Sequence, residues 1–140
     1  MKVQDVMTSP AHSTCPEVSV ASAARTMADY GCGALPVLDN AGRPIGILTN
    51  RDVRRAVAVG DLGRPMKVSE AMTLEPVTCS AETPLVEALK ILSEREIQHL
   101  PVVDIQGRLV GIVSLSDIVA ATHRATMFRI SEPVLDQARN

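Results

Sequence analysis

The chain of 140 residues contains an internal repeat, and this repeat constrains the fold more than any other feature. Residues 35–52 read LPVLDNAGRPIGILTNRD, and residues 100–117 read LPVVDIQGRLVGIVSLSD. The two segments align without a gap at a spacing of 65 residues, and the same register carries Val3 onto Val68. A fixed period over most of a chain indicates duplicated structural units that bury their faces against each other. With two copies, we expect a pseudo-twofold pair with equivalent clefts at its interface.

The first half of each copy predicts an extended or turn segment followed by a helix. In the first copy, apolar residues recur at helical spacing over 20–27, and the helix is expected to end near Gly31 and Gly33. In the second copy, Thr83 is the expected N-cap and Pro84 the first helical residue.

The second half of each copy predicts a β-hairpin followed by a second helix. Short apolar runs at 34–38 and 44–48 flank a segment rich in turn formers, and the second hairpin turns at 104–107. The closing helices are expected to open at Thr49 and Ser114, where each hairpin ends.

These elements divide the chain into two units and a tail. We expect a first unit at 1–59, a linker at 60–66, a second unit at 67–122 and a C-terminal tail at 123–140. Proline lacks a backbone N–H and fixes its own φ, so Pro133 argues against a long helix in the tail.

Composition limits the core and the class of partner. Hydrophobic residues make up 46% of the chain, but its aromatic residues are Tyr30 and Phe128 alone, so the core must be aliphatic. The net charge of −2 and the lack of a basic run argue against binding to a nucleic-acid backbone. No apolar stretch approaches the roughly 20 residues of a membrane span, and the N-terminus lacks a signal-peptide core. We therefore expect a soluble cytoplasmic protein with neither a nucleic-acid nor a membrane partner.

The cysteines do not form a recognisable site. Cys15, Cys32 and Cys79 show no C-x-x-C spacing, and the three histidines do not complete a zinc cluster. We expect reduced, buried or half-buried thiols. The alternative is a disulfide or redox role, because Cys15 and Cys79 stand one step apart in the repeat register.

A hydroxyl and a carboxylate stand three residues apart at each passage from a strand into a helix: Thr49 with Asp52, and Ser114 with Asp117. One interpretation is a capping box, which stabilises a helix by on the order of 1 kcal/mol. The other is a ligand site, because such a carboxylate can accept hydrogen bonds from the vicinal hydroxyls of a ribose. The hydroxyl and the free N–H groups of the helix end would suit a phosphate. A carboxylate has about four acceptor positions, so both roles can coexist.

These motifs resemble a tandem pair of cystathionine-β-synthase (CBS) motifs, also called a Bateman module, over residues 1–122. The matching segments are Met7-Thr8, 33–39 and 46–52 in the first copy, and Met72-Thr73, 99–104 and 111–117 in the second. The resemblance implies an α/β (α+β) fold. In that fold two pseudo-twofold-related β-α-β-β-α units pack sheet to sheet and leave two clefts.

In this family the clefts often bind adenine nucleotides or related adenosyl ligands, so the resemblance also implies site residues. By position, the contacts to ribose and phosphate fall on Thr49, Arg51, Asp52, Ser114 and Asp117. The remaining positions near the ligand are Gly33, Ala34, Gln98 and His99, with His12 and Val77 near the base and Ile47 and Ile112 as its apolar flanks. AMP, ADP or ATP is the expected ligand, NAD and S-adenosylmethionine stay open, and no cofactor or metal is required.

The two clefts are expected to differ. Arg51, Arg54 and Arg55 place positive charge around the first motif, whereas Ser116 stands at the position equivalent to Arg51. For Arg54 and Arg55 a solvated helix face is the alternative. His99 either contacts a phosphate or lies on the surface, and an ordinary histidine pKa near 6.5 would make binding sensitive to pH.

We expect no enzyme, because the chain shows no catalytic triad, metal-ligand set or phosphate-binding glycine loop. It has no room for an attached catalytic domain and would be a stand-alone module. The first hypothesis is a regulatory sensor that binds an adenosine-containing ligand and modulates an unidentified partner protein or its own assembly. The second is a ligand-independent homodimeric interaction scaffold. A homodimer is expected in either case, because modules of this family commonly associate into a disc. A nucleic-acid or redox accessory role is a third hypothesis, which the charge and the cysteine spacing disfavour.

Overall fold

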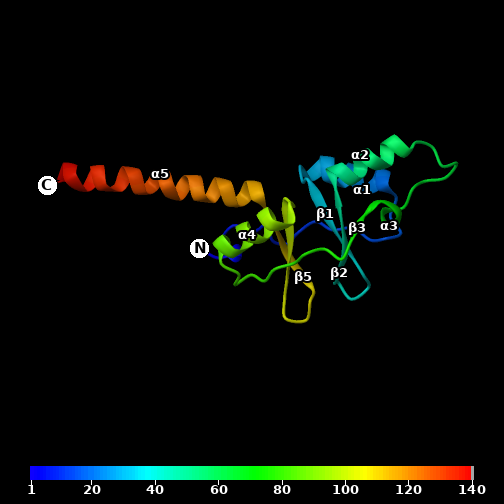
Figure 1. Cartoon of the computed structure of the whole chain (residues 1–140), viewed down its shortest axis with the longest axis horizontal. Coiled ribbons are helices and arrows are strands. Elements are labelled where there is room, and N and C mark those ends of the chain that lie inside the picture. Colours follow the sequence, from blue (N-terminus) through cyan, green and yellow to red (C-terminus); the bar gives the residue numbers. More distant parts are fainter. Residues whose placement is uncertain (140) are drawn as a thin grey trace.

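Figure 1 shows a computed structural model of the chain, which describes the backbone of residues 1–139 and the side chains of residues 1–127. It confirms the α/β class, with helices and strands in two similar sets. Along the chain the elements are η1 (Val3–Asp5), α1 (Val20–Tyr30), β1 (Ala34–Leu38), β2 (Pro44–Thr49), α2 (Asn50–Val59), α3 (Val68–Ala71), β3 (Thr73–Leu74), α4 (Leu85–Arg95), β4 (His99–Val103), β5 (Leu109–Ser114) and α5 (Leu115–Arg139).

Both predicted hairpins are present and match each other in detail. β1 pairs antiparallel with β2, and β4 pairs antiparallel with β5, each with a register shift at the same place in the repeat. At the start of the first turn, Asp39 Oδ1 accepts hydrogen bonds from the N–H groups of Ala41 and Arg43, both at 2.9 Å. Asp104 Oδ1 does the same in the second hairpin. The repeat in the sequence is therefore a repeat of turn chemistry as well as of strand pattern.

The beginning of α4 differs from the expectation. Its N-cap is Pro84, with no side-chain cap, and Thr83 Oγ1 instead accepts a hydrogen bond from the N–H of Ser80 at 3.1 Å. The prediction of Thr83 as the N-cap is wrong, because the extended backbone of an N-cap (φ −60°, ψ 142° here) falls on Pro84, whose ring allows it. The equivalent residue of α1 is Ser19, whose side chain does accept from Ser22 N–H.

The leading segments of the two repeats are exchanged. β3, which belongs to the second repeat, pairs with Gly46 and Ile47 of β2 in the first repeat. Reciprocally, Thr8 of the first repeat pairs with Ile112 of β5 in the second. Each repeat therefore supplies an edge strand or bridge to the sheet of the other. The expected division into units at 1–59 and 67–122 stays a prediction.

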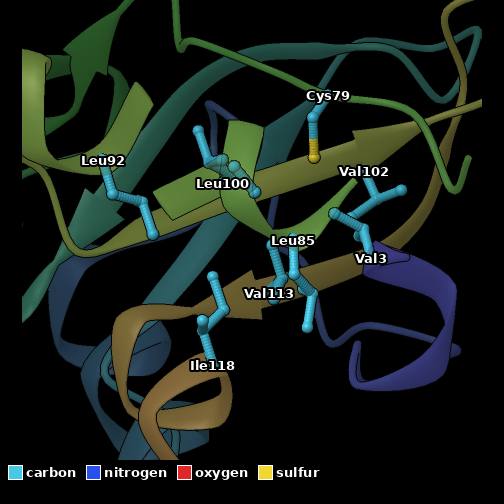
Figure 2. Close-up of a cluster of buried hydrophobic side chains, with 9 residues drawn as sticks. Val3, Cys79, Leu85, Leu92, Leu100, Val102, Val113 and Ile118 are labelled. Atoms are coloured by element: carbon cyan, nitrogen blue, oxygen red, sulfur yellow. The ribbon is translucent and has the colours of Figure 1, made fainter. Parts of the chain in front are cut away.

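The same exchange operates in the two hydrophobic cores. Val3 is fully buried in the core of the second repeat, and Val68 is fully buried in the core of the first. Figure 2 shows the second core, which also contains Cys79, Leu85, Ala88, Leu92, Leu100, Val102, Val113 and Ile118. The first core contains Ala23, Met27, Leu35, Val37 and Leu48 at the matching positions. Both cores are built without aromatic side chains, as the composition requires.

The C-terminal segment also corrects an expectation. α5 continues through Pro133 to Arg139, so the prediction that no long helix forms in the tail is wrong. A proline removes one backbone donor and disturbs one turn, whereas the turns on either side keep their own hydrogen bonds. In Figure 1, α5 projects beyond the rest of the molecule. Among the described residues, no helix combines the length and the apolar character that crossing a membrane requires.

Candidate functional site

The strand-to-helix junctions hold complete capping boxes. In the first repeat, Thr49 Oγ1 accepts a hydrogen bond from Asp52 N–H at 3.2 Å, and Asp52 Oδ2 accepts from Thr49 N–H at 2.9 Å. In the second repeat, Ser114 Oγ accepts from Asp117 N–H and Asp117 Oδ2 accepts from Ser114 N–H, both at 3.0 Å. The capping interpretation therefore holds at both junctions, and it fixes the orientation of each carboxylate.

Each box uses only one oxygen of its carboxylate. Thr49 Oγ1 also donates to Asp52 Oδ2, at 3.1 Å, and no hydrogen bond within the described residues reaches Asp52 Oδ1 or Asp117 Oδ1. Asp52 is only 4% exposed, and Asp117 is half-buried. A carboxylate oxygen has two lone pairs to satisfy, so each junction presents an acceptor that the rest of the described chain leaves open.

One backbone donor is also open at each junction. The first helical N–H groups are taken, because Asn50 N–H donates to Gly33 O at 3.1 Å and Leu115 N–H donates to Gln98 O at 2.8 Å. The next residues, Arg51 and Ser116, have N–H groups that donate to no described residue. A free N–H at a helix N-terminus attracts an anionic or polar oxygen. Each junction thus combines one acceptor and one donor.

The hairpin strands bring further predicted residues to these junctions. Ala34, which is buried, pairs with Thr49 across β1 and β2, and His99 pairs with Ser114 across β4 and β5. Gly33 and Gln98 also lie at these junctions, because their carbonyl oxygens accept hydrogen bonds from the first N–H groups of α2 and α5. The structure therefore brings the segment before each Leu-Pro-Val motif to the junction of its own repeat.

His99 also reaches the other repeat. A Cβ built on Gly33 would lie 3.2 Å from His99 Nε2 and 3.5 Å from Asn50 Nδ2. Burial lowers the pKa of His99 below its ordinary value, and the nearby negative charge of Asp117 opposes that shift. His99 is therefore a half-buried residue between Asp117 and the first repeat.

The predicted apolar flanks lie beside the exchanged segments. Ile47, at 9% exposure, pairs with Thr73, and Ile112, which is half-buried, pairs with Thr8. Each flank therefore belongs to one repeat and its edge partner to the other. Val77 is half-buried and packs against the core of the second repeat.

His12 has a neighbour that sequence reasoning did not anticipate. Its ring stacks on Tyr30, with ring centroids 3.8 Å apart and planes 18° from parallel. Both residues are exposed. No local pattern joins residue 12 to the end of a helix at residue 30, so the pairing has no signal in the sequence.

A hollow of about 460 Å³ lies between the repeats at the opposite end of β2 from Thr49. Its lining residues are Arg43, Pro44, Ile45, Glu75, Pro76, Thr78, Val103 and Gly107. At about 3.3 Å per residue, Ile45 is roughly 13 Å along the strand from Thr49. Sequence reasoning missed these residues, although Val77, a predicted base contact, is in the same loop as Pro76 and Thr78.

The positive charge around the first junction forms no ion pair among the described residues. Arg51, Arg54 and Arg55 are exposed on α2, and none of them forms a salt bridge with a described residue. The equivalent positions of α5 are Ser116, Val119 and Ala120. The two junctions therefore share their geometry and differ in their electrostatics.

The thiols and possible metal ligands do not gather into a site. Cys15, Cys32 and Cys79 are free cysteines; Cys79 is buried and Cys32 half-buried as expected, but the expectation is wrong for Cys15, which is exposed. Burial raises the pKa of Cys79 to about 11 and raises the pKa of Cys32, so both thiols are protonated near neutral pH. Among the described residues, no group of three or more His, Cys, Asp or Glu side chains could hold a metal ion.

The sequence matches one family and several curated proteins. Residues 3–59 and 68–124 each match the CBS domain. A 17.7 kDa protein of Acidianus ambivalens is 33% identical over 120 residues, covering 86% of this chain and 72% of that protein. The CBS domain-containing protein YhcV of Bacillus subtilis is 37% identical, covering 83% of this chain and 81% of that one. Inosine-5′-monophosphate dehydrogenase of Methanocaldococcus jannaschii is 33% identical, but the match covers only 23% of that enzyme.

Solved structures share the fold. The CBS domain pair of protein MJ0100, in complex with 5′-methylthioadenosine and S-adenosyl-L-methionine, matches with a TM-score of 0.80 and 28% identity over 87% of this chain and 99% of that one. The CBS-domain protein ATU1752 of Agrobacterium tumefaciens matches with a TM-score of 0.78 and 32% identity, over 87% and 99%. CBSX2 in complex with AMP matches with a TM-score of 0.76 and 26% identity, over 89% and 98%.

Proposed function

The chain belongs to the CBS domain family and holds two copies of the domain, and from this we propose that it is a regulatory module that binds an adenosine-containing ligand between its repeats. Binding changes the affinity of the module for a partner protein or for a second copy of itself. Such a change requires a ligand that binds the two arrangements with different affinity.

One observation carries this proposal: each junction leaves a carboxylate oxygen and a helix N–H without a partner among the described residues. At the first junction these are Asp52 Oδ1 and the N–H of Arg51, and at the second they are Asp117 Oδ1 and the N–H of Ser116. Asp52 as a residue is only 4% exposed, but among the described residues no buried side-chain oxygen lacks a partner, so its free Oδ1 is the part of the carboxylate that stays accessible to a ligand. A ribose hydroxyl would donate to the carboxylate, and an oxygen of the ligand would accept from the N–H.

The ligands bound by the solved relatives support the adenosine part. MJ0100 binds 5′-methylthioadenosine and S-adenosyl-L-methionine, and CBSX2 binds AMP. These molecules share adenine linked to a ribose ring and differ in the group at the 5′ position. We propose that the junctions recognise the shared ribose through Asp52 and Asp117, and that neighbouring residues select the 5′ group.

The charge around each junction indicates which 5′ group fits. Arg51 at the first junction favours a phosphate, as in AMP, ADP or ATP, because an arginine binds phosphate through several N–H groups. Ser116 at the second junction offers only a neutral hydroxyl beside a half-buried His99. We propose that the second cleft accepts a ligand without a 5′ phosphate more readily, so S-adenosylmethionine belongs in the same screen, together with NAD, whose diphosphate provides the contrast.

We propose no enzymatic activity for these 140 residues. The dehydrogenase relative shares only a segment of 118 residues, which is 23% of its length. The function of the module is then the transmission of ligand binding to a partner, with a homodimer as the expected assembly. The second candidate function, a ligand-independent scaffold, is favoured by the complete capping boxes, because these give Asp52 and Asp117 a structural role of their own.

The test is a binding screen by calorimetry and thermal shift with AMP, ADP, ATP, NAD, S-adenosylmethionine and 5′-methylthioadenosine. A ligand at about 100 times its dissociation constant stabilises the folded state by roughly 2.7 kcal/mol. Asp52→Asn and Asp117→Asn are the informative variants, because asparagine keeps one oxygen for the capping box and replaces the other oxygen by a donor. Loss of binding with a melting temperature that falls by no more than a few degrees supports the ligand role. If no ligand binds the wild type, the scaffold function stands instead.

A further inference from the structure

The two hairpins contact each other at their turns, and the contacts there are reciprocal. Arg43 Nε donates a hydrogen bond to Gln106 O at 3.0 Å. A Cβ built on Gly107 would lie 3.7 Å from Arg43 Nε, and a Cβ built on Gly42 would lie 4.0 Å from Arg108 Cγ. Each arginine therefore lies beside the glycine of the other hairpin, and these contacts hold the turns of the two repeats together.

At the other end of the hairpins, where α2 and α5 begin, the contact is one-sided. A Cβ built on Gly33 would lie 3.2 Å from His99 Nε2 and 3.4 Å from His99 Cε1. In the 65-residue register, the residue of the first repeat that is equivalent to His99 is Ala34. The methyl group of Ala34 is too short to make the reciprocal contact. His99 therefore breaks the pseudo-twofold symmetry at this end.

The His99 ring lies beside both junctions. His99 pairs with Ser114 across β4 and β5, and opposite residues of an antiparallel pair place their side chains on the same face of the sheet. Burial lowers the pKa of His99, and the nearby negative charge of Asp117 opposes that shift. On the side of the first repeat, Asn50 Nδ2 would lie 3.5 Å from the same Cβ on Gly33. The ring thus separates the carboxylate of the second junction from the first residue of α2.

Gly33 connects this ring to the first cleft. Its carbonyl oxygen accepts a hydrogen bond from Asn50 N–H at 3.1 Å, so Gly33 is tied to the start of α2. The next N–H of this helix, that of Arg51, is the donor that the proposed function assigns to a ligand. A ligand on Asp117 pushes the ring toward Gly33 and narrows the first cleft. A ligand in the first cleft pushes the ring back toward Asp117.

From this arrangement we infer that His99 couples the two clefts, so that a ligand bound at Asp117 weakens the binding of a ligand at Asp52, and the reverse. The inference rests on the proposed function and names the residue through which its two sites interact. The effect is equal in both directions, because the coupling of two binding sites is a single free energy. The module then fills one cleft at low ligand concentration and the other only at a higher concentration.

Calorimetry with two probes measures this coupling. AMP is titrated into the protein with and without saturating 5′-methylthioadenosine. In Asp117→Asn the second cleft is disabled, so any effect of 5′-methylthioadenosine on AMP binding is direct competition in the first cleft. In the wild type, the dissociation constant of AMP should rise at least fivefold more than in Asp117→Asn. In His99→Ala, which carries the residue of the first repeat, this excess should disappear.

The ratio is the readout, because a residue that only contacts a ligand changes the affinity and leaves the excess in place. The matched control is His123→Ala, since His123 is exposed on α5, and this variant should keep the full excess. An equal rise in the wild type and Asp117→Asn, or an excess that survives in His99→Ala, overturns this inference and leaves the proposed function standing. Failure of both probes to bind the wild type overturns the two together.

Nuclear magnetic resonance tests the same contact without a ligand. Among the described residues around the ring, Asp117 is the charged group that acts on the pKa of His99, whereas Ser114, Gly33 and Asn50 carry no charge. The amide signals of Gly33 and Asn50 should follow the His99 titration between pH 7.5 and pH 5. Asp117→Asn removes the charge that favours the protonated ring, so all three midpoints should move to lower pH together. Amide signals that stay constant while His99 titrates would contradict the contact.

Discussion

His99 of the second repeat and Gly33 of the first share one small space. A Cβ on Gly33 would lie 3.2 Å from His99 Nε2, closer than most side-chain contacts allow. The same histidine is close enough to Asp117 for that carboxylate to favour its charged form. The His99 side chain thus lies between Asp117, a predicted ligand residue of the second repeat, and the backbone of Gly33 in the first.

Gly33→Ala tests this relationship. The added methyl group must displace the His99 ring, so we expect a loss of about 0.5–1 kcal/mol in unfolding free energy, measured by urea denaturation. In a His99→Ala background the same change should cost close to nothing, because the space is vacant. The coupling energy of this double-mutant cycle is the measurement. Equal costs in the two backgrounds would contradict the shared space.

His99 also predicts a pH dependence of stability. Burial lowers its pKa in the folded state, so the unfolded chain binds the proton more tightly. The stabilisation is therefore complete above the ordinary histidine pKa of about 6.5 and is lost as the pH falls through the lowered folded value. Urea midpoints between pH 7.5 and pH 5 should fall for the wild type and fall less for His99→Gln. His12→Gln is the control, because His12 is exposed.

Asp52→Ala separates the structural role of the motif from ligand binding. It removes both hydrogen bonds that Asp52 Oδ2 accepts from Thr49, at a site only 4% exposed. We expect a loss of about 1–2 kcal/mol of stability in the absence of any ligand, read from the melting temperature. Asp52→Asn should lose less than half of this. An alanine variant as stable as the wild type would mean that the box contributes nothing to the fold.

The end of α4 offers a stabilising substitution. Glu96 is the C-cap in the left-handed conformation at φ 54°, whereas the equivalent residue of α1 is Gly31 at φ 64°. A side chain is strained in this region and glycine is not. Glu96→Gly should therefore raise the stability by about 0.5–1 kcal/mol. Gly31→Ala, the reciprocal change, should lower it by a similar amount in the same thermal melts.

The local parts of this structure were predictable from the sequence. The hairpins, the helices that open after Thr49 and Ser114, and the capping boxes depend on residues within a few positions of each other. The N-cap of α4 was predicted wrongly, because the local pattern favoured Thr83 whereas the structure uses Pro84.

The non-local parts were not predictable. Thr8 and Thr73 carry no signal of which sheet they join, because an edge strand of two residues has no periodicity. The stacking of His12 on Tyr30 and the approach of His99 to Gly33 depend on how the repeats pack. All of the predicted ligand residues, Asp52 and Asp117 included, remain predictions, since only a bound ligand tests them.

The exchange of leading segments has a consequence for synthesis on the ribosome. Thr8 leaves the ribosome early, but its partner Ile112 follows about 100 residues later. At roughly 5–20 residues per second, about 5–20 s pass between the synthesis of Thr8 and that of Ile112, the residue with which it pairs. The first repeat waits less, because Thr73 of β3 follows its partner Ile47 by only 26 residues and Val68 completes the first core. The second core joins Val3 to residues as late as Ile118. Translation must therefore pass most of the second repeat before that core can close, and a nascent chain stalled before that point leaves it exposed.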